Sequence, residues 1–463
     1  MKKYYGYLVC FLLIAIINTG TSQIKSGPMV GYTELRTSQV WLQFERTQNL
    51  DEIQYSIEEK GENPFGFKAN SKPEIEINYL DKERKIVLLK FSNLIPSQTY
   101  TYNIKFNQTE ITPATISGDF TTLELWHFRR TPPDFSFITG SCNYVNDPPY
   151  DRPGRPYGQD SSIFTPMAQE SAKFMLWLGD NWYTREIDYF SPWGLQNRAE
   201  HDRAVPELQP LLKAMPQFAA WDDHDYGPND GDKSFIFRQE SREVFKKYWA
   251  NPSYGENQQG IYSQFVWNDV AFFLLDDRTF RSNDELKDSI KGKPNSAKKM
   301  LGETQMEWLK NALVQANSFF GISFKIIVLG SQVLNPVSPY NSFYHYPSEL
   351  DELKEFIAQE NIKGVIFLTG DRHHSEIIKI DRENNYPLYD ITVSPLTSGT
   401  HTISGVEVNN PYRVMLLDKI QNYAVFNFSG DYKNRVLNVS FKDKKGEVVK
   451  TWSVPYNSLR KPK

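Results

Sequence analysis

Short segments in which apolar and polar residues alternate fill the first part of the chain after an N-terminal apolar run. Alternation with a period of two is typical of strands that bury one face. Polar residues, glycines and prolines separate these segments at short, regular intervals. The pattern predicts an all-β sandwich over residues 23–126, with strands at Val40–Phe44, Ile53–Ile57, Glu74–Tyr79, Lys85–Phe91, Tyr100–Phe106 and Ile116–Leu123.

The pattern changes after "RRTPPD" (residues 129–134), which we interpret as a linker. Continuous apolar runs now alternate with amphipathic stretches, as in α/β domains whose sheets are covered on both faces. The stretches Glu303–Ala316 and Ser348–Gln359 predict helices, and Ser348 is expected to cap the second. We expect an α/β domain over residues 127–463, with strands at Phe135–Gly140, Phe174–Gly179, Phe218–Asp222, Val270–Leu275, Lys325–Leu329, Gly364–Thr369, Ala424–Phe428, Val436–Phe441 and Val448–Val454.

The N-terminus has the three-part layout of a secretory signal peptide. Lys2 and Lys3 precede an apolar run, Leu8–Ile17, that is short for a membrane span and is followed by small polar residues. We expect cleavage after Ser22, which removes residues 1–22 and exports the protein to a periplasm, the cell surface or the medium. Cys10 lies inside the apolar run, which disfavours a lipoprotein, and no twin-arginine pair is present.

Composition narrows the class of protein. A chain of 463 residues favours two domains, and 40% apolar with 14% aromatic residues argues against disorder. The net charge of -4 and the lack of a basic stripe argue against stable nucleic-acid binding. No later apolar run is long enough to predict a transmembrane anchor.

Cleavage of the signal peptide would leave Cys142 as the one cysteine of the mature chain, so no internal disulfide is expected. A lone thiol in an oxidising compartment is either reactive or metal-bound, or else it is a buried and inert residue. The sequence around Cys142 alone does not separate these readings.

Polar clusters follow the predicted buried strands, at the sheet edge where active sites of α/β folds collect. Carboxylate and amide oxygens suit calcium, magnesium or manganese, whereas thiolate, phenolate and imidazole suit iron or zinc. Because the clusters contain both kinds, they favour a mixed site in which two or three cations share a carboxylate and clamp a phosphoryl group. The clusters are Ser141-Cys142-Asn143, Asp180-Asn181-Trp182-Tyr183, Asp222-Asp223-His224-Asp225 and Asp371-Arg372-His373-His374.

Each cluster also has a structural interpretation. A Gly-Asp pair after a strand is often a helix cap or a turn, and His224 between carboxylates could be a hydrogen-bonded structural histidine. Asp276-Asp277-Arg278 follows another apolar strand, where Arg278 could bind phosphate or form an ion pair. The shared strand-end context of all the clusters favours the functional interpretation, because carboxylates packed so densely repel unless a cation neutralises them.

An ordered set of motifs resembles the PhoD-type alkaline phosphatases, a branch of the calcineurin-like metallophosphoesterases. The preceding "FSNLIPSQTYTYNIKF" and "GDFTT" resemble late strands of fibronectin type III domains, which that family carries at its N-terminus. Such a domain could be a binding module, but a spacer or lid is the favoured interpretation. The catalytic motifs are "GSC", "WLGDNWY", "WDDHDYGPND", "LLDDRTFR", "LGETQMEWL", "LGSQV", "LTGDRHHSE" and "SPLTSG".

The resemblance implies a four-layer α-β-β-α core and an iron-calcium site (Fe³⁺ and Ca²⁺, with Zn²⁺, Mn²⁺ and Mg²⁺ as alternatives). It places Cys142, Asp180 and Tyr183 at the ferric ion, with Asp180 bridging to the harder ion. Asp371 and His373 match the family's late Asp-x-His ligands. The segment around Asp223 and Asn229 matches the source of the remaining oxygen ligands.

Catalytic roles are expected for His224 and Arg372, with His224 facing the phosphate or protonating the leaving group. The chain departs from the family pattern in lacking a twin-arginine signal, in the more basic "GDRHH", and in "NSFYHYPSE", whose His345 we place at the rim rather than among the ligands. The expected reaction is direct, in-line attack of metal-bound hydroxide on a small phosphate mono- or diester.

Two other functions fit parts of the sequence. One is a hydrolase that uses Cys142 as nucleophile with His224 or His373 as base, which would be inactivated by iodoacetamide and indifferent to chelators. The other is a non-enzymatic surface-binding protein that uses the β-sandwich and aromatic loops.

Overall fold

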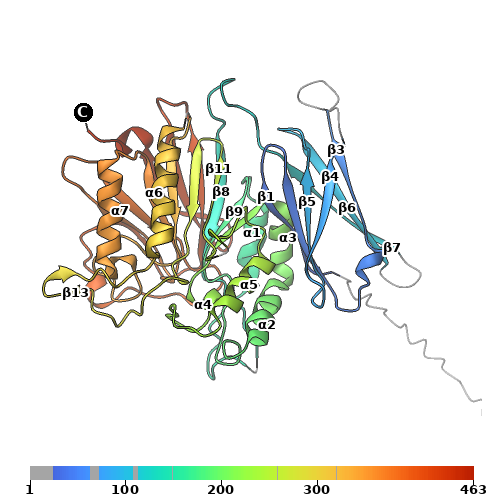
Figure 1. Cartoon of the computed structure of the whole chain (residues 1–463), viewed down its shortest axis with the longest axis horizontal. Helices are drawn as coiled ribbons and strands as arrows, with labels where there is room; N and C mark the ends of the chain where they lie inside the picture. The colour runs from blue at the N-terminus through green and yellow to red at the C-terminus, as the bar shows by residue number, and fades with distance from the viewer. Residues whose placement is uncertain are drawn as a thin grey trace, which may run out of the picture.

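The computed structural model describes residues 24–62, 72–107, 113–148, 150–257, 259–319 and 321–462. The expected signal peptide, residues 1–22, lies outside these ranges. The N-terminal sheets lie at one end of the molecule, and helices α6 (Gly302–Ser318) and α7 (Pro347–Gln359) lie at the other (Figure 1). Among the described helices, none combines the length and apolar character needed to cross a bilayer.

Two antiparallel sheets form the N-terminal part, and their facing side chains, including Val40, Phe91 and Phe120, form one buried cluster. The alternation predicted every strand here except β1, whose Gly27 and Gly31 interrupt the pattern. The sheets have the orders β1 (Ile24–Thr33), β2 (Ser38–Phe44), β5 (Ile86–Ser92), β4 (Glu74–Asp81) and β3 (Gln54–Lys60), β6 (Thr99–Asn107), β7 (Pro113–Thr121).

Trp41 of β2 anchors the N-terminal sheets to the rest of the chain. Its indole N–H donates to the carbonyl of Lys247 at 2.7 Å, and its ring lies 5.8 Å from that of Tyr248. On β1, the N–H of Tyr32 donates to the carbonyl of Ala250 at 2.9 Å. Both buried rings and backbone hydrogen bonds therefore join the two parts.

Two mixed sheets form the remainder of the chain. Strands β8, β9 and β10 run parallel in one sheet, and β12, β15, β16 and β18 run parallel in the other. The six-stranded order is β10 (Gln217–Ala220), β9 (Met175–Leu178), β8 (Phe135–Gly140), β20 (Asn422–Ser429), β21 (Val436–Asp443), β22 (Val448–Pro455). The seven-stranded order is β11 (Ser263–Trp267), β12 (Val270–Leu274), β15 (Phe324–Val328), β16 (Val365–Thr369), β18 (Leu388–Thr392), β17 (Ser375–Ile380), β19 (Arg413–Leu417).

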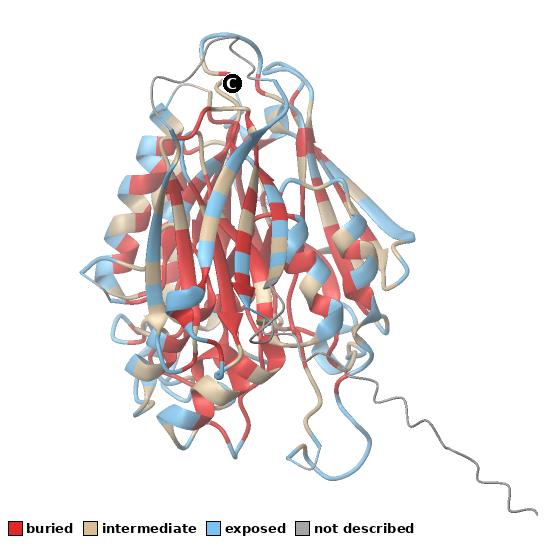
Figure 2. Ribbon diagram, turned by 90° about the vertical axis from the view of Figure 1, so that its right-hand side faces the viewer, coloured by how far each residue is buried: buried red, intermediate tan, exposed pale blue. Residues whose placement is uncertain are grey.

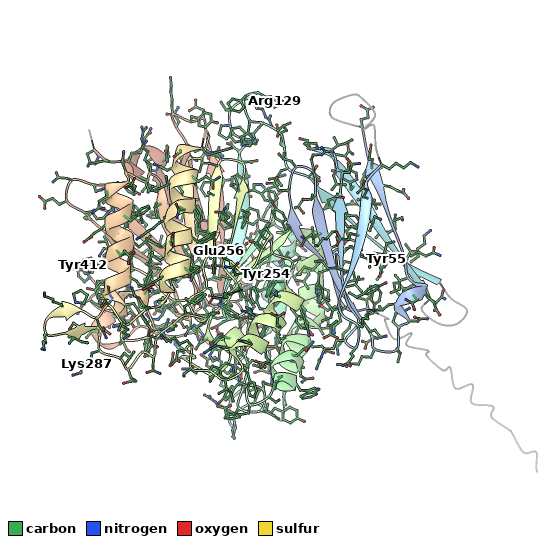
Figure 3. All side chains as sticks on the ribbon, in the orientation of Figure 1. Tyr55, Arg129, Tyr254, Glu256, Lys287 and Tyr412 are labelled. Carbon is green, nitrogen blue, oxygen red and sulfur yellow. The ribbon has the colours of Figure 1, made fainter. Side chains whose placement is uncertain are left out.

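Aromatic side chains fill the space between these two sheets. The rings of Phe137 and Phe174 stack at 4.9 Å, and they lie 5.3 and 5.4 Å from Phe272 of the other sheet. Helices α6 and α7 cover the far side of the seven-stranded sheet, and α1 (Phe164–Gln169), α3 (Gln209–Ala214) and α5 (Arg238–Tyr248) cover that of the six-stranded one. Figure 2 shows the buried strands in the interior. Figure 3 shows the side chains between Tyr55 at one end and Tyr412 at the other.

The core strands match the predicted runs closely, whereas other details differ. The prediction that Ser348 caps the second helix was wrong: α7 begins at Pro347, whose fixed φ suits a first helical position, and Tyr346 precedes it without a side-chain cap. Apolar periodicity did not predict α2 (Pro192–Arg203), because its buried residues include Arg198 and Glu200. The patterns also gave no sign of β11, β17, β18, β19, the short strands β13 (Ser289–Ile290) and β14 (Lys293–Pro294), or the one-turn helix α4 (Asp223–Tyr226).

Glu200 of α2 links the two parts through a buried ion cluster. Its side chain is 4% exposed and pairs with Arg84, which is 7% exposed, and with Lys25 and Arg46. Burial alone would raise the pKa of Glu200, but Lys25 and Arg84 outweigh burial and lower it. The ionised carboxylate therefore stabilises the folded protein.

We predict that Glu200→Gln leaves Arg84 buried without a charged partner and lowers the free energy of unfolding by about 3–5 kcal/mol. Because folding lowers the pKa of Glu200, the wild type has its full advantage in free energy of unfolding at pH values above the unfolded-state pKa of about 4.3. This advantage should shrink as the pH falls through the lower pKa of the folded state. Urea denaturation of both proteins from pH 7 down to pH 3 measures it. Equal midpoints at pH 7 would contradict the prediction.

Candidate metal centre

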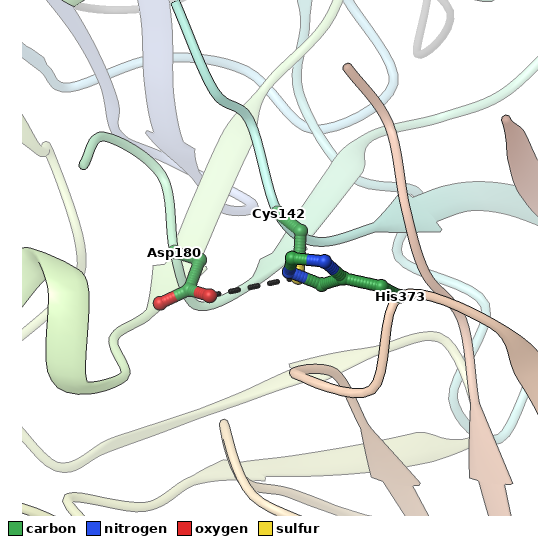
Figure 4. A group of neighbouring side chains, drawn as sticks. All are labelled: Cys142, Asp180 and His373. Atoms are coloured by element: carbon green, nitrogen blue, oxygen red, sulfur yellow. Dashed lines mark hydrogen bonds between the residues drawn. The ribbon is translucent and has the colours of Figure 1, made fainter. Parts of the chain in front are cut away.

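The strand-end clusters predicted from the sequence meet at one edge of the two sheets. Cys142 follows β8, Asp180 follows β9, and His373 follows β16. Figure 4 shows their side chains pointing toward one another, with the thiol of Cys142 3.5 Å from Oδ2 of Asp180. One potential ligand atom from each of the three residues lies within 4.8 Å of the others.

The backbone at these positions is strained. Cys142, Asp180, Asp371 and His373 have φ values of 62°, 52°, 68° and 53°, in the left-handed region that residues with a Cβ rarely adopt. Such strain persists only where surrounding structure imposes it, and it gathers at functional sites. The strained turns aim side chains from separate strands at one point.

Tyr183 completes the first cluster. Its hydroxyl donates to Oδ2 of Asp180 at 2.9 Å and lies 3.0 Å from Nε2 of His373. The hydroxyl of Ser394 donates to the thiol of Cys142 at 3.1 Å. The first cluster thus combines thiol, phenol, imidazole and carboxylate groups, a donor set that suits iron or zinc.

Asp180 also belongs to a second group, with Asp223 and His224, whose potential ligand atoms again lie within 4.8 Å of one another. The backbone N–H of His224 donates to Oδ1 of Asp180 at 3.3 Å, and the N–H of Asp230 donates to Oδ2 of Asp223 at 2.7 Å. Nδ1 of His224 is buried and has no hydrogen-bond partner in the described part of the chain. The two groups therefore share one carboxylate.

The electrostatics of this edge favour a bound cation. Burial raises the pKa of Asp180 well above its usual value, and the carboxylates of Asp223, Asp225 and Asp371 raise it further. Burial also raises the pKa of Asp371 to about 7. Burial opposes ionisation of Asp223 as well, but His224 and Arg278 outweigh it and hold its pKa low. A divalent or trivalent cation would offset this concentration of acidic groups.

Other predicted site residues line a cleft of about 530 Å³ beside these clusters, among them Asn229, Asp371 and Arg372. Asn229 is exposed and its amide donates to Asp230 at 2.6 Å. Both terminal nitrogens of Arg372 are occupied, one by Glu407 at 2.9 and 3.0 Å and the other by Gln332 and Ser338, both at 2.8 Å. Arg372 therefore faces the cleft from a fixed position.

Two alternatives left open by the sequence are resolved by contacts. Arg278 is fully buried and binds Asp222, so it forms an ion pair beneath the site and does not reach the cleft surface. His345 lies away from both ligand groups, where Nδ1 contacts Asp288 and Nε2 contacts the carbonyl of Ser338, each at 3.0 Å.

Several residues that line the cleft were not predicted from the sequence. The hydroxyl of Tyr157 lies 2.6 Å from Nδ1 of His373 and 3.1 Å from Nε2 of His401, so it holds the imidazole with Nε2 toward Tyr183. Arg185 also lines the cleft. Tyr157, His401 and Arg185 lie on irregular loops, so no periodicity predicts them. The one nearby motif is "DNWY" (residues 180–183), which precedes Arg185.

Comparison with known proteins places this geometry in a family. The profile of the PhoD-like phosphatase family matches residues 141–438. Alkaline phosphatase D of Bacillus subtilis (strain 168) is 25% identical over 206 residues, which is 39% of this chain and only 35% of that relative's length.

Solved structures show the same fold. The structure of PhoD matches with a TM-score of 0.70 and 16% identity, covering 95% of this chain and 92% of the other. Purple acid phosphatase PPD1 from yellow lupin (Lupinus luteus) seeds matches with a TM-score of 0.63 and 11% identity, covering 93% of this chain and 75% of the other. Since the family profile covers more than half of the chain and every residue of both ligand groups, the chain belongs to the PhoD-like phosphatase family.

Proposed function

We propose that the protein is a metal-dependent phosphoric ester hydrolase that acts on small phosphate monoesters or diesters. The observation that carries the proposal is Asp180, whose carboxylate belongs to both candidate ligand groups. Such sharing suits cations about 3.5–4 Å apart, which hold one phosphoryl group between them. The family match and the phosphatase-like fold support the same assignment.

The donor chemistry supports Fe³⁺ at the group formed by Cys142, Tyr183, His373 and Asp180. Oxygen donors around the shared carboxylate support Ca²⁺ as the partner, with Zn²⁺, Mn²⁺ and Mg²⁺ as alternatives. Burial raises the pKa values of the Cys142 thiol and the Tyr183 phenol, so both would release protons on binding a cation. The proposed oxygen ligands are Asp180, Asp223, Asn229 and Asp371.

When bound, the cations would stabilise charge on the phosphoryl oxygens and activate water near neutral pH. The chain's own residues then position the ester and move protons. The ring of His224 stacks on that of Tyr183 at 4.3 Å, and its buried Nδ1 has no partner among the described residues. Burial lowers the pKa of His224 to about 4, so the neutral ring suits a hydrogen bond to a phosphoryl oxygen. It suits proton donation to the leaving oxygen where the negative charge of a bound ester raises that pKa. Arg372 adds fixed positive charge to the same cleft.

The Cys142 nucleophile alternative fits the geometry poorly. Its side chain is fully buried, and burial raises the pKa of the thiol, whereas a nucleophilic cysteine needs access and a lowered pKa. Direct attack of water, without a covalent phosphoenzyme, is therefore the proposed route.

The finer assignments of the fold belong to the same proposal. We assign residues 23–126 to a fibronectin type III-like domain that acts as a spacer or lid, and residues 127–463 to a four-layer α-β-β-α phosphatase domain. We assign residues 1–22 to a signal peptide and the mature protein to a periplasm, the cell surface or the medium. The paired N-terminal sheets, and the helices outside the two central sheets, support these assignments.

We predict that the purified mature protein contains iron and calcium, and that chelation abolishes hydrolysis of p-nitrophenyl phosphate and bis-p-nitrophenyl phosphate. Mass spectrometry of metals, paired with both assays before and after chelation and metal restoration, tests this. Metal-free protein that still hydrolyses either ester would refute the proposal.

We predict that Cys142→Ser lowers iron retention, because a hydroxyl is a weaker ligand than a thiolate. Iron that stays bound in Cys142→Ser would still show a Tyr183–ferric charge-transfer band. The visible absorbance of the two proteins must therefore be compared per bound iron ion. Full iron content in Cys142→Ser would exclude the ligand role.

We predict that His224→Asn lowers kcat by roughly 10²–10⁴-fold while iron and calcium contents stay at the wild-type level, as expected for loss of a proton donor. Metal analysis of the same preparation provides the comparison. If calcium content falls in parallel with activity, His224 is a ligand and not the proton donor.

A further inference from the structure

Arg185 lines the candidate cleft with hydrogen-bonding capacity that the protein does not use. Its side chain comes from the loop after Tyr183, and the residue is only 7% exposed. Nε donates to the hydroxyl of Tyr144 at 3.1 Å, and Nη1 donates to the carbonyl of Thr184 at 3.2 Å. Within the described ranges, no protein group accepts a hydrogen bond from Nη2.

Arg185 also lacks a carboxylate partner in the described part of the chain. Its neighbour Glu186 pairs with Arg152 instead, at 2.7 Å. A largely buried guanidinium without an anion is costly, because its charge has lost much of its water and gained no counter-charge. An anionic ligand in the cleft would supply the missing partner.

Other buried arginines show how different this arrangement is. Arg278 binds Asp222, and Nη2 of Arg372 donates to both carboxylate oxygens of Glu407. Arg203 also pairs with no carboxylate of the described residues. It contacts Met29, and the ring of Trp249 lies 3.8 Å from its guanidinium carbon. Of these arginines, only Arg185 and Arg372 reach the cleft. Of these two, only Arg185 has a terminal nitrogen without a partner in the described ranges.

Aromatic rings hold the Arg185 guanidinium in place. Its central carbon lies 4.1 Å from the ring centre of Tyr144 and 4.9 Å from that of Tyr183. Tyr183 in turn stacks on His224. The guanidinium is therefore fixed beside both the candidate metal ligands and the candidate proton donor, and ordering it on substrate binding would cost little entropy.

We propose that Arg185 binds the third terminal phosphoryl oxygen of a phosphate monoester and thereby sets a preference for monoesters over diesters. The inference rests on the proposed hydrolase function. A monoester has three terminal oxygens and a diester has two. Where the two ligand groups engage two of these oxygens through bound cations, only a monoester leaves a charged oxygen for the guanidinium.

The test compares wild type with Arg185→Met, Arg185→Lys and the control Arg130→Met, whose side chain is 56% exposed outside the cleft. The assays are kcat/KM for p-nitrophenyl phosphate and bis-p-nitrophenyl phosphate, inhibition by inorganic phosphate, metal content and Tm. Arg185→Met should lower kcat/KM for the monoester by about 10–100-fold, as expected for a charged hydrogen bond. It should weaken phosphate inhibition by a similar factor and affect the diester at least about tenfold less.

Arg185→Lys should restore part of the monoester activity, because lysine keeps the charge but not the planar fork, and Arg130→Met should behave as wild type. Equal losses for both esters at unchanged metal content would overturn the inference, as would loss of metal from either Arg185 variant. If Arg185→Met has a lowered Tm, the test uses Arg185→Lys instead. The ratio of kcat/KM for the monoester to kcat/KM for the diester should then be lower in Arg185→Lys than in wild type.

Failure of the proposed function would look different. Wild-type protein loaded with iron and calcium would then hydrolyse neither ester, whereas failure of the Arg185 inference leaves the wild type active on both with an unchanged ratio in Arg185→Met.

Discussion

Buried carboxylates determine the arrangement of the candidate metal centre, because each needs a compensating positive charge or hydrogen-bond donors. Asp222 is balanced by the buried guanidinium of Arg278, and Asp225 accepts backbone N–H groups that partly offset its burial. Asp180 has no ion pair among the described residues, and burial and neighbouring acids raise its pKa. Arg278 lies 3.9 Å from Asp223, too far to neutralise it fully. The charge left unbalanced lies at Asp180, the residue that both ligand groups share.

Backbone geometry brings these acids together. Each parallel strand ends in a tight turn, and several turn residues accept a left-handed φ. A Cβ at Gly330 would lie 2.5 Å from Cγ of Asp222, and one at Gly370 would lie 2.7 Å from the carbonyl oxygen of Leu178. The edges of the two sheets therefore approach so closely that only glycine fits between them. Aromatic packing between the sheets supplies the stability that offsets strain and charge repulsion.

The sequence predicted the centre better than its surroundings, for a physical reason. The carboxyl ends of parallel strands share an edge, so Cys142, Asp180 and His373 could be expected to meet although they are far apart in the chain. Tyr157 and His401 could not, because they reach His373 from irregular loops that carry no periodicity. Helix α2 was missed because its buried face is charged, and Glu200 on that face pairs with Lys25 and Arg84 from the N-terminal part of the chain.

The arginines show why residue type alone does not assign a role. Arg278 and Arg372 both stand in motifs that follow buried strands, and either could bind phosphate on the sequence alone. In the folded chain, Asp222 pairs with the buried Arg278. Glu407 occupies one terminal nitrogen of Arg372, and Gln332 and Ser338 occupy the other. Arg185 lies two residues beyond the strand-end cluster that ends at Tyr183 and was not part of the prediction. Its Nη2 has no protein partner in the described part of the chain, and its guanidinium lies beside Tyr183. The availability of a charged group for an external ligand is therefore decided by its neighbours, which tertiary structure brings together and local sequence does not.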